Sequence, residues 1–204
     1  SGYGTVSLPK NAANGQVSGI KIEGLTATNL INGRGDNLEG WTNITGDLTI
    51  EGNFFKYIGG GTGKRDSYPI QVRQGDKLYL SYFYKTTGTP NCNHSFRLFL
   101  GETQIQAMDA LLATENVNKE LTRFSWVSEC EGDADNIAFR PTDLTSETGH
   151  WYFKHIMLIN LTQAFGAGNE PTKEECDQIF ANYFDGTKST ISGSRLKSVG
   201  KNLL

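Results

Sequence analysis

The chain has 204 residues, a formal net charge of −3 at pH 7 and 24 glycines. This length fits one sizeable β domain with short appendages, and the glycine content favours short strands joined by tight turns. A small negative charge without a basic stripe argues against a nucleic-acid surface or a binder of anionic membranes, and no transmembrane run or signal peptide is present.

The chain begins with Ser1 and contains three cysteines. Because it does not begin with Met, we expect a segment or processed product of a longer protein. The odd cysteine count and the absence of CxxC spacing predict free, structural thiols at Cys92, Cys130 and Cys176. A bridge between Cys92 and Cys130 is the alternative.

The two ends of the chain resemble each other. Residues 1–19 are polar and rich in glycine, which predicts a linker or an arm laid on a neighbour. Residues 20–31 indicate two short strands. SGIKIEGLTATNLI at 18–31 is echoed by SGSRLKSVGKNLL at 192–204. We therefore expect the main domain at 20–187, and a linker with the start of a following module at 188–204.

The central region alternates apolar and polar residues between turn signals. Strands are expected at 47–58, 68–73, 77–85, 94–100, 121–130 and 136–140, and residues 108–116 indicate a short helical or looped excursion. This spacing is typical of an all-β antiparallel sandwich.

Residues 151–159 are almost continuously apolar, which predicts a strand covered on both faces. Glycines at 166 and 168 then end the strand. Thr172 and Glu175 have the spacing of a capping box, so a helix is expected over 173–183, ended by residues 185–186. Ile179, Phe180 and Phe184 lie on its apolar face and are expected to dock against the sandwich.

Residues 158–187, LINLTQAFGAGNEPTKEECDQIFANYFDGT, resemble a segment that recurs in structural proteins of tailed bacteriophages and prophages. In that family the segment closes a jelly roll similar to carbohydrate-binding modules, in tail, baseplate or fibre proteins. The resemblance extends more loosely back to about residue 30. It implies a location in the virion, assembled in the host cytoplasm, with other virion proteins and copies of itself as partners. It implies a glycan ligand and supplies no catalytic residues.

Two shorter stretches resemble carbohydrate-binding jelly rolls. QVRQGDKLYLSYFYKTTG at 71–88 is similar to a hairpin of those modules, and NGRGDNLEGW at 32–41 is similar to the stretch that follows their first strand. The second likeness implies a calcium ion held by oxygens of Asp36 and Glu39. Lys154 and His155 stand where the family has acids, so a plain polar turn is the alternative.

Enzyme chemistry finds no support in the pattern. His94, His150 and His155 have no metal-ligand spacing, and each is expected on the surface or in strand packing. GGGTG at 59–63 with Lys64 lacks the ending of a phosphate loop. We therefore expect neither an enzyme nor a resident cofactor.

Aromatic and arginine side chains are the candidates for sugar contacts. On residues 78–84, Tyr79 lies on the face opposite Leu78 and Leu80, so it is expected to stack on a sugar ring. Arg97, between Phe96 and Leu98, is expected to clamp hydroxyls. The remaining candidates are Trp41 and Tyr68 as groove walls, with Arg123 and Arg140 as further clamps.

Each of these candidates has an alternative reading. Core packing is the alternative for the aromatic residues, and cross-strand salt bridges are the alternative for the arginines. The sequence thus predicts a non-catalytic virion module that binds host-surface carbohydrate. The rival hypothesis is a purely architectural tail or capsid module without a glycan ligand.

Overall fold

The computed structural model describes residues 20–43, 48–58, 66–143, 147–184 and 190–198. The chain divides into two compact units, one formed by Ser1–Leu25 with Ser192–Leu204 and the other by Thr26–Ile191. The predicted arm at 1–19, the loop at 59–65 and the predicted helix end at 185–186 lie outside the described residues.

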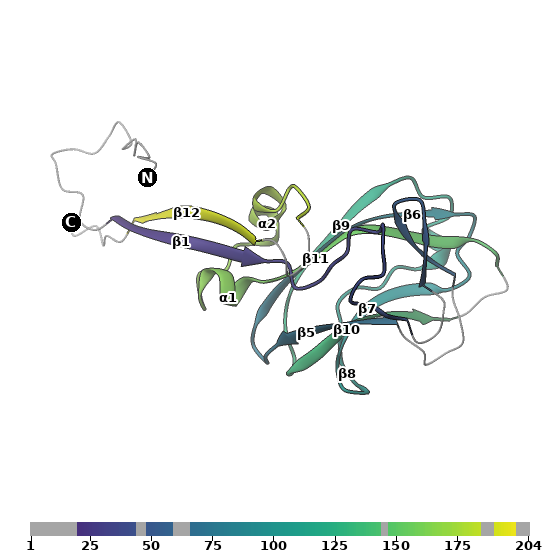
Figure 1. The fold of residues 1–204 in the computed structure, drawn as a ribbon, viewed down its shortest axis with the longest axis horizontal. Helices are drawn as coiled ribbons and strands as arrows, with labels where there is room; N and C mark the ends of the chain where they lie inside the picture. The colour runs from purple at the N-terminus through teal and green to yellow at the C-terminus, as the bar shows by residue number, and fades with distance from the viewer. Residues whose placement is uncertain (1–19, 44–47, 59–65, 144–146, 185–189, 199–204) are drawn as a thin grey trace. The chain divides into compact units, whose positions relative to one another are not determined.

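The first unit contains a two-stranded sheet made by the two similar ends of the chain. Strand β1 (Ile20–Thr28) pairs with β12 (Thr190–Ser198), and both are drawn in Figure 1. The sequence placed residues 20–28 in the main domain and residues 188–204 beyond it. In the structure β1 and β12, which come from these two segments, pair with each other, and the sheets of the sandwich begin with β2.

The second unit is a sandwich of two five-stranded sheets, ordered β2-β5-β10-β7-β8 and β3-β4-β11-β6-β9. From β4 to β11, successive strands alternate between the sheets except at the β7–β8 hairpin, which is the strand order of a jelly roll. The predicted fold is therefore confirmed. The strands are β2 (Thr42–Asn43), β3 (Leu48–Glu51), β4 (Phe54–Tyr57), β5 (Asp66–Val72), β6 (Lys77–Thr87), β7 (Asn93–Leu100), β8 (Thr103–Ala107), β9 (Thr122–Glu129), β10 (Ala134–Thr142) and β11 (His150–Asn160).

The core lies between the two sheets and is largely aromatic. Alternate residues of β6 face inward, as their period of two requires, and Tyr82 among them is fully buried. Its ring packs against Phe96 of β7 and Phe153 of β11, with centroids 5.1 Å and 5.7 Å away. The predicted division of β6 into two faces is thus confirmed for the core side.

Strand β11 is buried along most of its length, as predicted, but it contains a bulge between Lys154 and Met157. Asn29 satisfies backbone groups there: its Oδ1 accepts from the Leu158 N–H at 3.0 Å, and its Nδ2 donates to the Ile156 carbonyl at 3.2 Å. Gly33 passes so close that a Cβ on it would lie 2.4 Å from the Ile156 Cβ. Residues 29–33 therefore stabilise the irregular part of β11.

Two short helices follow β11, α1 (Leu161–Phe165) and α2 (Lys173–Ile179). The sequence missed α1, which Asn160 caps by accepting from the Gln163 N–H at 2.9 Å. The capping box of Thr172 and Glu175 is confirmed. The helix ends at Ile179, earlier than predicted, because Phe180 leaves the helical conformation and turns its ring into the protein.

A 3₁₀ turn, η1 (Ala113–Glu115), lies in the predicted excursion at 108–116. All three cysteines are buried and free, as expected. No helix in the described part of the chain is long and apolar enough to cross a membrane.

Candidate functional site

Trp41 and Tyr68 are core residues and do not wall an open groove. Both are 8% exposed, and their ring centroids lie 5.4 Å apart. The Trp41 ring also packs against Phe139 at 4.9 Å, and its Nε1 donates to the Asn32 carbonyl at 2.8 Å. The packing alternative therefore describes both residues, because their side chains fill the space between the sheets.

Tyr79 does lie on the outer face of its sheet, but α2 covers that face. The side chain is 0% exposed, and its ring stacks on Phe180 with centroids 5.5 Å apart. Its hydroxyl donates to Asp177 at 2.8 Å and accepts from Arg123 Nη2 at 2.8 Å. Burial raises the pKa of Tyr79 to about 12. The expected stacking surface is thus closed, because the helix occupies the place predicted for a sugar.

Arg123 has a structural role in the same contact. Its Nη2 also donates to the Phe180 carbonyl at 2.9 Å, and its Nε donates to the Ser81 hydroxyl at 3.2 Å. The guanidinium joins the end of α2 to strands β6 and β9. Arg123 is therefore removed from the candidate clamps.

Arg97 and Arg140 come together on the outer face of the other sheet, β2-β5-β10-β7-β8. Arg97 Nη1 donates to Gln104 Oε1 at 2.6 Å, and Arg140 Nη1 donates to the same oxygen at 3.4 Å. The Arg140 guanidinium lies 5.8 Å from the centroid of the Phe99 ring. In the described part of the chain, neither arginine forms a salt bridge. The neutral amide of Gln104 bridges the two guanidinium groups.

Strand register explains how these side chains meet. Phe99 pairs with Asn136 on one side and Gln104 on the other, and Asn136 also pairs with Pro69. The next row on the same face contains Arg97 between two small residues, and a serine extends it. Its members are Ser67, Ala138, Arg97 and Ala107. In this row Ala138 is fully buried and Ala107 is exposed. We call the outer surface formed by these two rows and Arg140 the arginine face.

The arginine face has hydrogen-bonding capacity that the protein leaves unused. Arg97 Nε and Asn136 Oδ1 are covered by protein and have no hydrogen-bond partner. Burial, and then the neighbouring charge of Arg140, lower the pKa of Arg97 below its ordinary value. Because these two atoms are covered, the groups open to a ligand on this face are the outer ends of the Arg97, Arg140 and Gln104 side chains.

A hollow of about 410 Å³ continues the arginine face toward β5 and the β7–β8 turn. Pro69, Asn136 and Asp135 are among its lining residues. Asp135 accepts from the Gly101 N–H at 3.0 Å and from Asn136 Nδ2 at 2.6 Å. The hollow is therefore held by hydrogen bonds between the turn and β10.

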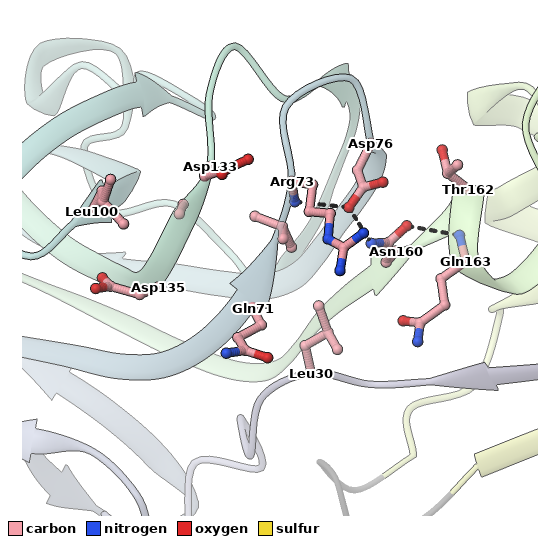
Figure 2. Close-up of a pocket in the computed structure, with 12 residues that line it drawn as sticks. Leu30, Gln71, Arg73, Asp76, Leu100, Asp133, Asp135, Asn160, Thr162 and Gln163 are labelled. Carbon is pink, nitrogen blue, oxygen red and sulfur yellow. Dashed lines mark hydrogen bonds between the residues drawn. The ribbon is translucent and has the colours of Figure 1, made fainter.

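A larger cleft of about 750 Å³ lies at the end of the sandwich and shares Asp135 with the hollow. Figure 2 shows the side chains of Gln71, Arg73 and Gln163 grouped around it. Its acids are already engaged: Asp76 accepts from the Arg73 N–H at 2.9 Å and from Asn160 Nδ2 at 2.7 Å. The cleft thus offers a guanidinium and two amides to a ligand.

Asp36, which was expected to hold calcium together with Glu39, is engaged by its neighbours. Asp36 pairs with the Arg34 guanidinium at 3.1 Å and accepts from Asn37 Nδ2 at 2.9 Å. A cation would have to displace that arginine. Among the described residues, no group of three or more His, Cys, Asp or Glu side chains is placed to hold a metal ion.

The geometry thus defines a jelly-roll module with an open polar face and an adjoining cleft. No family model and no curated protein matches the sequence. Among solved structures, a family 29 carbohydrate-binding module from Piromyces equi is similar, with 13% identity and a TM-score of 0.43 over 67% of this chain and 91% of that chain.

Two further structures are similar at the same level. The CBM22-1–GH10 modules of an endo-1,4-β-D-xylanase from Clostridium thermocellum, complexed with xylohexaose, give 14% identity and a TM-score of 0.46 over 65% of this chain and 28% of that one. A mutant family 29 module complexed with cellulohexaose gives 12% identity and a TM-score of 0.43 over 67% of this chain and 91% of that chain. Because these identities and TM-scores are low, the jelly-roll assignment rests on the order of the strands in the two sheets.

Proposed function

We propose that this chain is a non-catalytic module that binds carbohydrate on the arginine face. The observation that carries the proposal is the pair Arg97 and Arg140, bridged by Gln104 on the outer face of the sheet. Planar guanidinium and amide groups suit neighbouring sugar hydroxyls, because they present several donors and acceptors in one plane.

A saccharide chain fits this surface across the strands. The hollow, which Ser67 helps to line, and the end cleft extend the surface beyond β5 and β10. Gln71, Arg73 and Gln163 would contact further sugar units in the cleft (Figure 2). The polar side chains would set orientation, as in other ligand sites.

The proposed setting is the particle of a tailed bacteriophage, where the module would attach the virion to host-surface glycan. Support comes from the resemblance of residues 158–187. In the structure the described part of this segment forms α1 and α2 and closes the outer face over Tyr79. The segment thus has a structural role in the fold, and ligand contacts are assigned to the opposite sheet.

Removing either arginine is expected to weaken saccharide binding. An array of bacterial cell-wall and capsular polysaccharides selects the ligand, and calorimetry with an oligosaccharide from it measures the Kd. Arg97→Ala and Arg140→Ala should each raise the Kd about tenfold or more, because a hydrogen bond from a charged group contributes roughly 1.5–3 kcal/mol.

Arg34→Ala is the matched control, since Arg34 is an exposed arginine whose guanidinium pairs with Asp36. It should leave the Kd unchanged. Full binding by the Arg97→Ala/Arg140→Ala double variant would place the ligand elsewhere. Absence of saturable binding to every polysaccharide would favour the purely architectural module.

A further inference from the structure

A second group of cations lies on the outer face of the sheet β3-β4-β11-β6-β9. Tyr152 of β11 pairs with Lys56 of β4 on one side and with Lys85 of β6 on the other. Phe54 and Lys154 complete the group, and we call these five residues the lysine cluster. It lies on the sheet opposite the arginine face, so the two surfaces are separate.

The ammonium groups of the lysine cluster gather around two rings. Lys85 Nζ lies 4.4 Å from the Phe54 ring centroid and 5.1 Å from that of Tyr152, and Lys154 Nζ lies 4.7 Å from the Phe54 centroid. Lys56 Nζ lies 5.7 Å from the Tyr152 centroid. Each contact is a cation–π interaction, which holds the charge over an aromatic surface.

Compensating negative charge is scarce in this group. Glu51 pairs with Lys56 at 2.7 Å and accepts from the Tyr152 hydroxyl at 3.1 Å. In the described part of the chain, Lys85 and Lys154 form no ion pair with a carboxylate. Two like charges beside one ring repel each other, and an anion between them would relieve that repulsion.

We propose that the lysine cluster binds a phosphate-bearing saccharide. Lysine is a compact point charge, and phosphate accepts from several such donors at once, whereas carboxylate recognition favours the planar fork of arginine. The half-buried Phe54 ring holds the Lys85 and Lys154 ammonium groups over it, so it positions the two charges that would contact the phosphate.

The test uses the full chain carrying Arg97→Ala and Arg140→Ala, so that failure of the arginine face does not affect the outcome. Glucose 1-phosphate, glucose, glucuronate and inorganic phosphate are titrated while amide and lysine NMR signals are followed. Glucose 1-phosphate is expected to shift the signals of the lysine cluster and to bind at least about fivefold more tightly than the other three compounds. Its affinity should fall at high salt.

Lys85→Gln/Lys154→Gln should reduce glucose 1-phosphate binding about tenfold or more, by loss of two charged contacts. The matched control Lys77→Gln/Lys119→Gln removes the same charge from lysines outside the cluster and should keep the affinity. Equal weakening in both double variants would show a general charge effect and overturn the proposal. So would glucose or glucuronate binding as well as the phosphate ester, or a single-stranded DNA oligomer competing at equal concentration.

Discussion

Replacing Phe180 by alanine is expected to lower the free energy of unfolding by roughly 3–5 kcal/mol, the range for deleting a buried phenyl ring. Phe180 is 0% exposed. Its ring stacks on Tyr79 at 5.5 Å and meets Phe165 edge-on at 6.5 Å. The substitution therefore leaves a cavity where α1, α2 and the sheet meet. Urea denaturation followed by circular dichroism measures the change.

Ile179→Ala is the control for the helix itself. Ile179 precedes Phe180 in the chain but is 45% exposed, which corrects the expectation that it docks against the sandwich. Its truncation should cost about 1 kcal/mol or less, since little apolar surface is lost from the interior. A large loss from Ile179→Ala and a small loss from Phe180→Ala would show that α2 packs through a different face.

The fold could be predicted because its signals are local. Each signal depends only on residues close together in the sequence. The signals are the alternation on β6, the apolar run of β11 and the Thr172–Glu175 capping box. The end of α2 could not be predicted, because residues 173–184 keep a helical apolar period beyond Ile179. The packing of Phe180 into the space beside Tyr79 ends the helix there, and that contact depends on tertiary structure.

The candidate site was predicted only in part. The parity of β6 placed Tyr79 on the outer face, but the sequence did not show that α2 would cover it. Arg97 was found because it lies between Phe96 and Leu98 on one strand. Gln104 and Asn136 were missed, because they approach Arg97 only through the register of β8 and β10. The lysine cluster was missed for the same reason, since its members come from three strands.

A buried group of titratable side chains gives a second large effect, on the pH dependence of stability. Asp109 accepts hydrogen bonds from the Tyr82 hydroxyl and the Phe96 N–H, and its Oδ2 lies 3.9 Å from His94 Nε2. Burial raises the pKa of Asp109 from 3.8 to about 7. Burial, with a smaller effect of Arg97, lowers the pKa of His94 from 6.5 to about 3.

These two pKa shifts act on stability in opposite directions. The folded state binds the Asp109 proton more tightly than the unfolded state, so its contribution is present below pH 3.8 and is lost as the pH rises through about 7. The folded state disfavours protonated His94, so its contribution is present above pH 6.5 and is lost as the pH falls through about 3. Over the shared range the two contributions largely offset each other.

Single substitutions should therefore separate the two opposing contributions to the pH dependence of stability. Relative to the unsubstituted chain, Asp109→Asn should gain stability as the pH rises from 4 to 7, and His94→Gln should lose stability over the same range, each by up to about 1.4 kcal/mol per pH unit. The Asp109→Asn/His94→Gln double variant should run parallel to the unsubstituted chain where the offset holds. Urea denaturation at half-unit pH steps gives the difference curves, in which any packing cost of a substitution appears as a constant. Curves for both single variants that stay parallel to that of the unsubstituted chain would show that neither group titrates differently on folding.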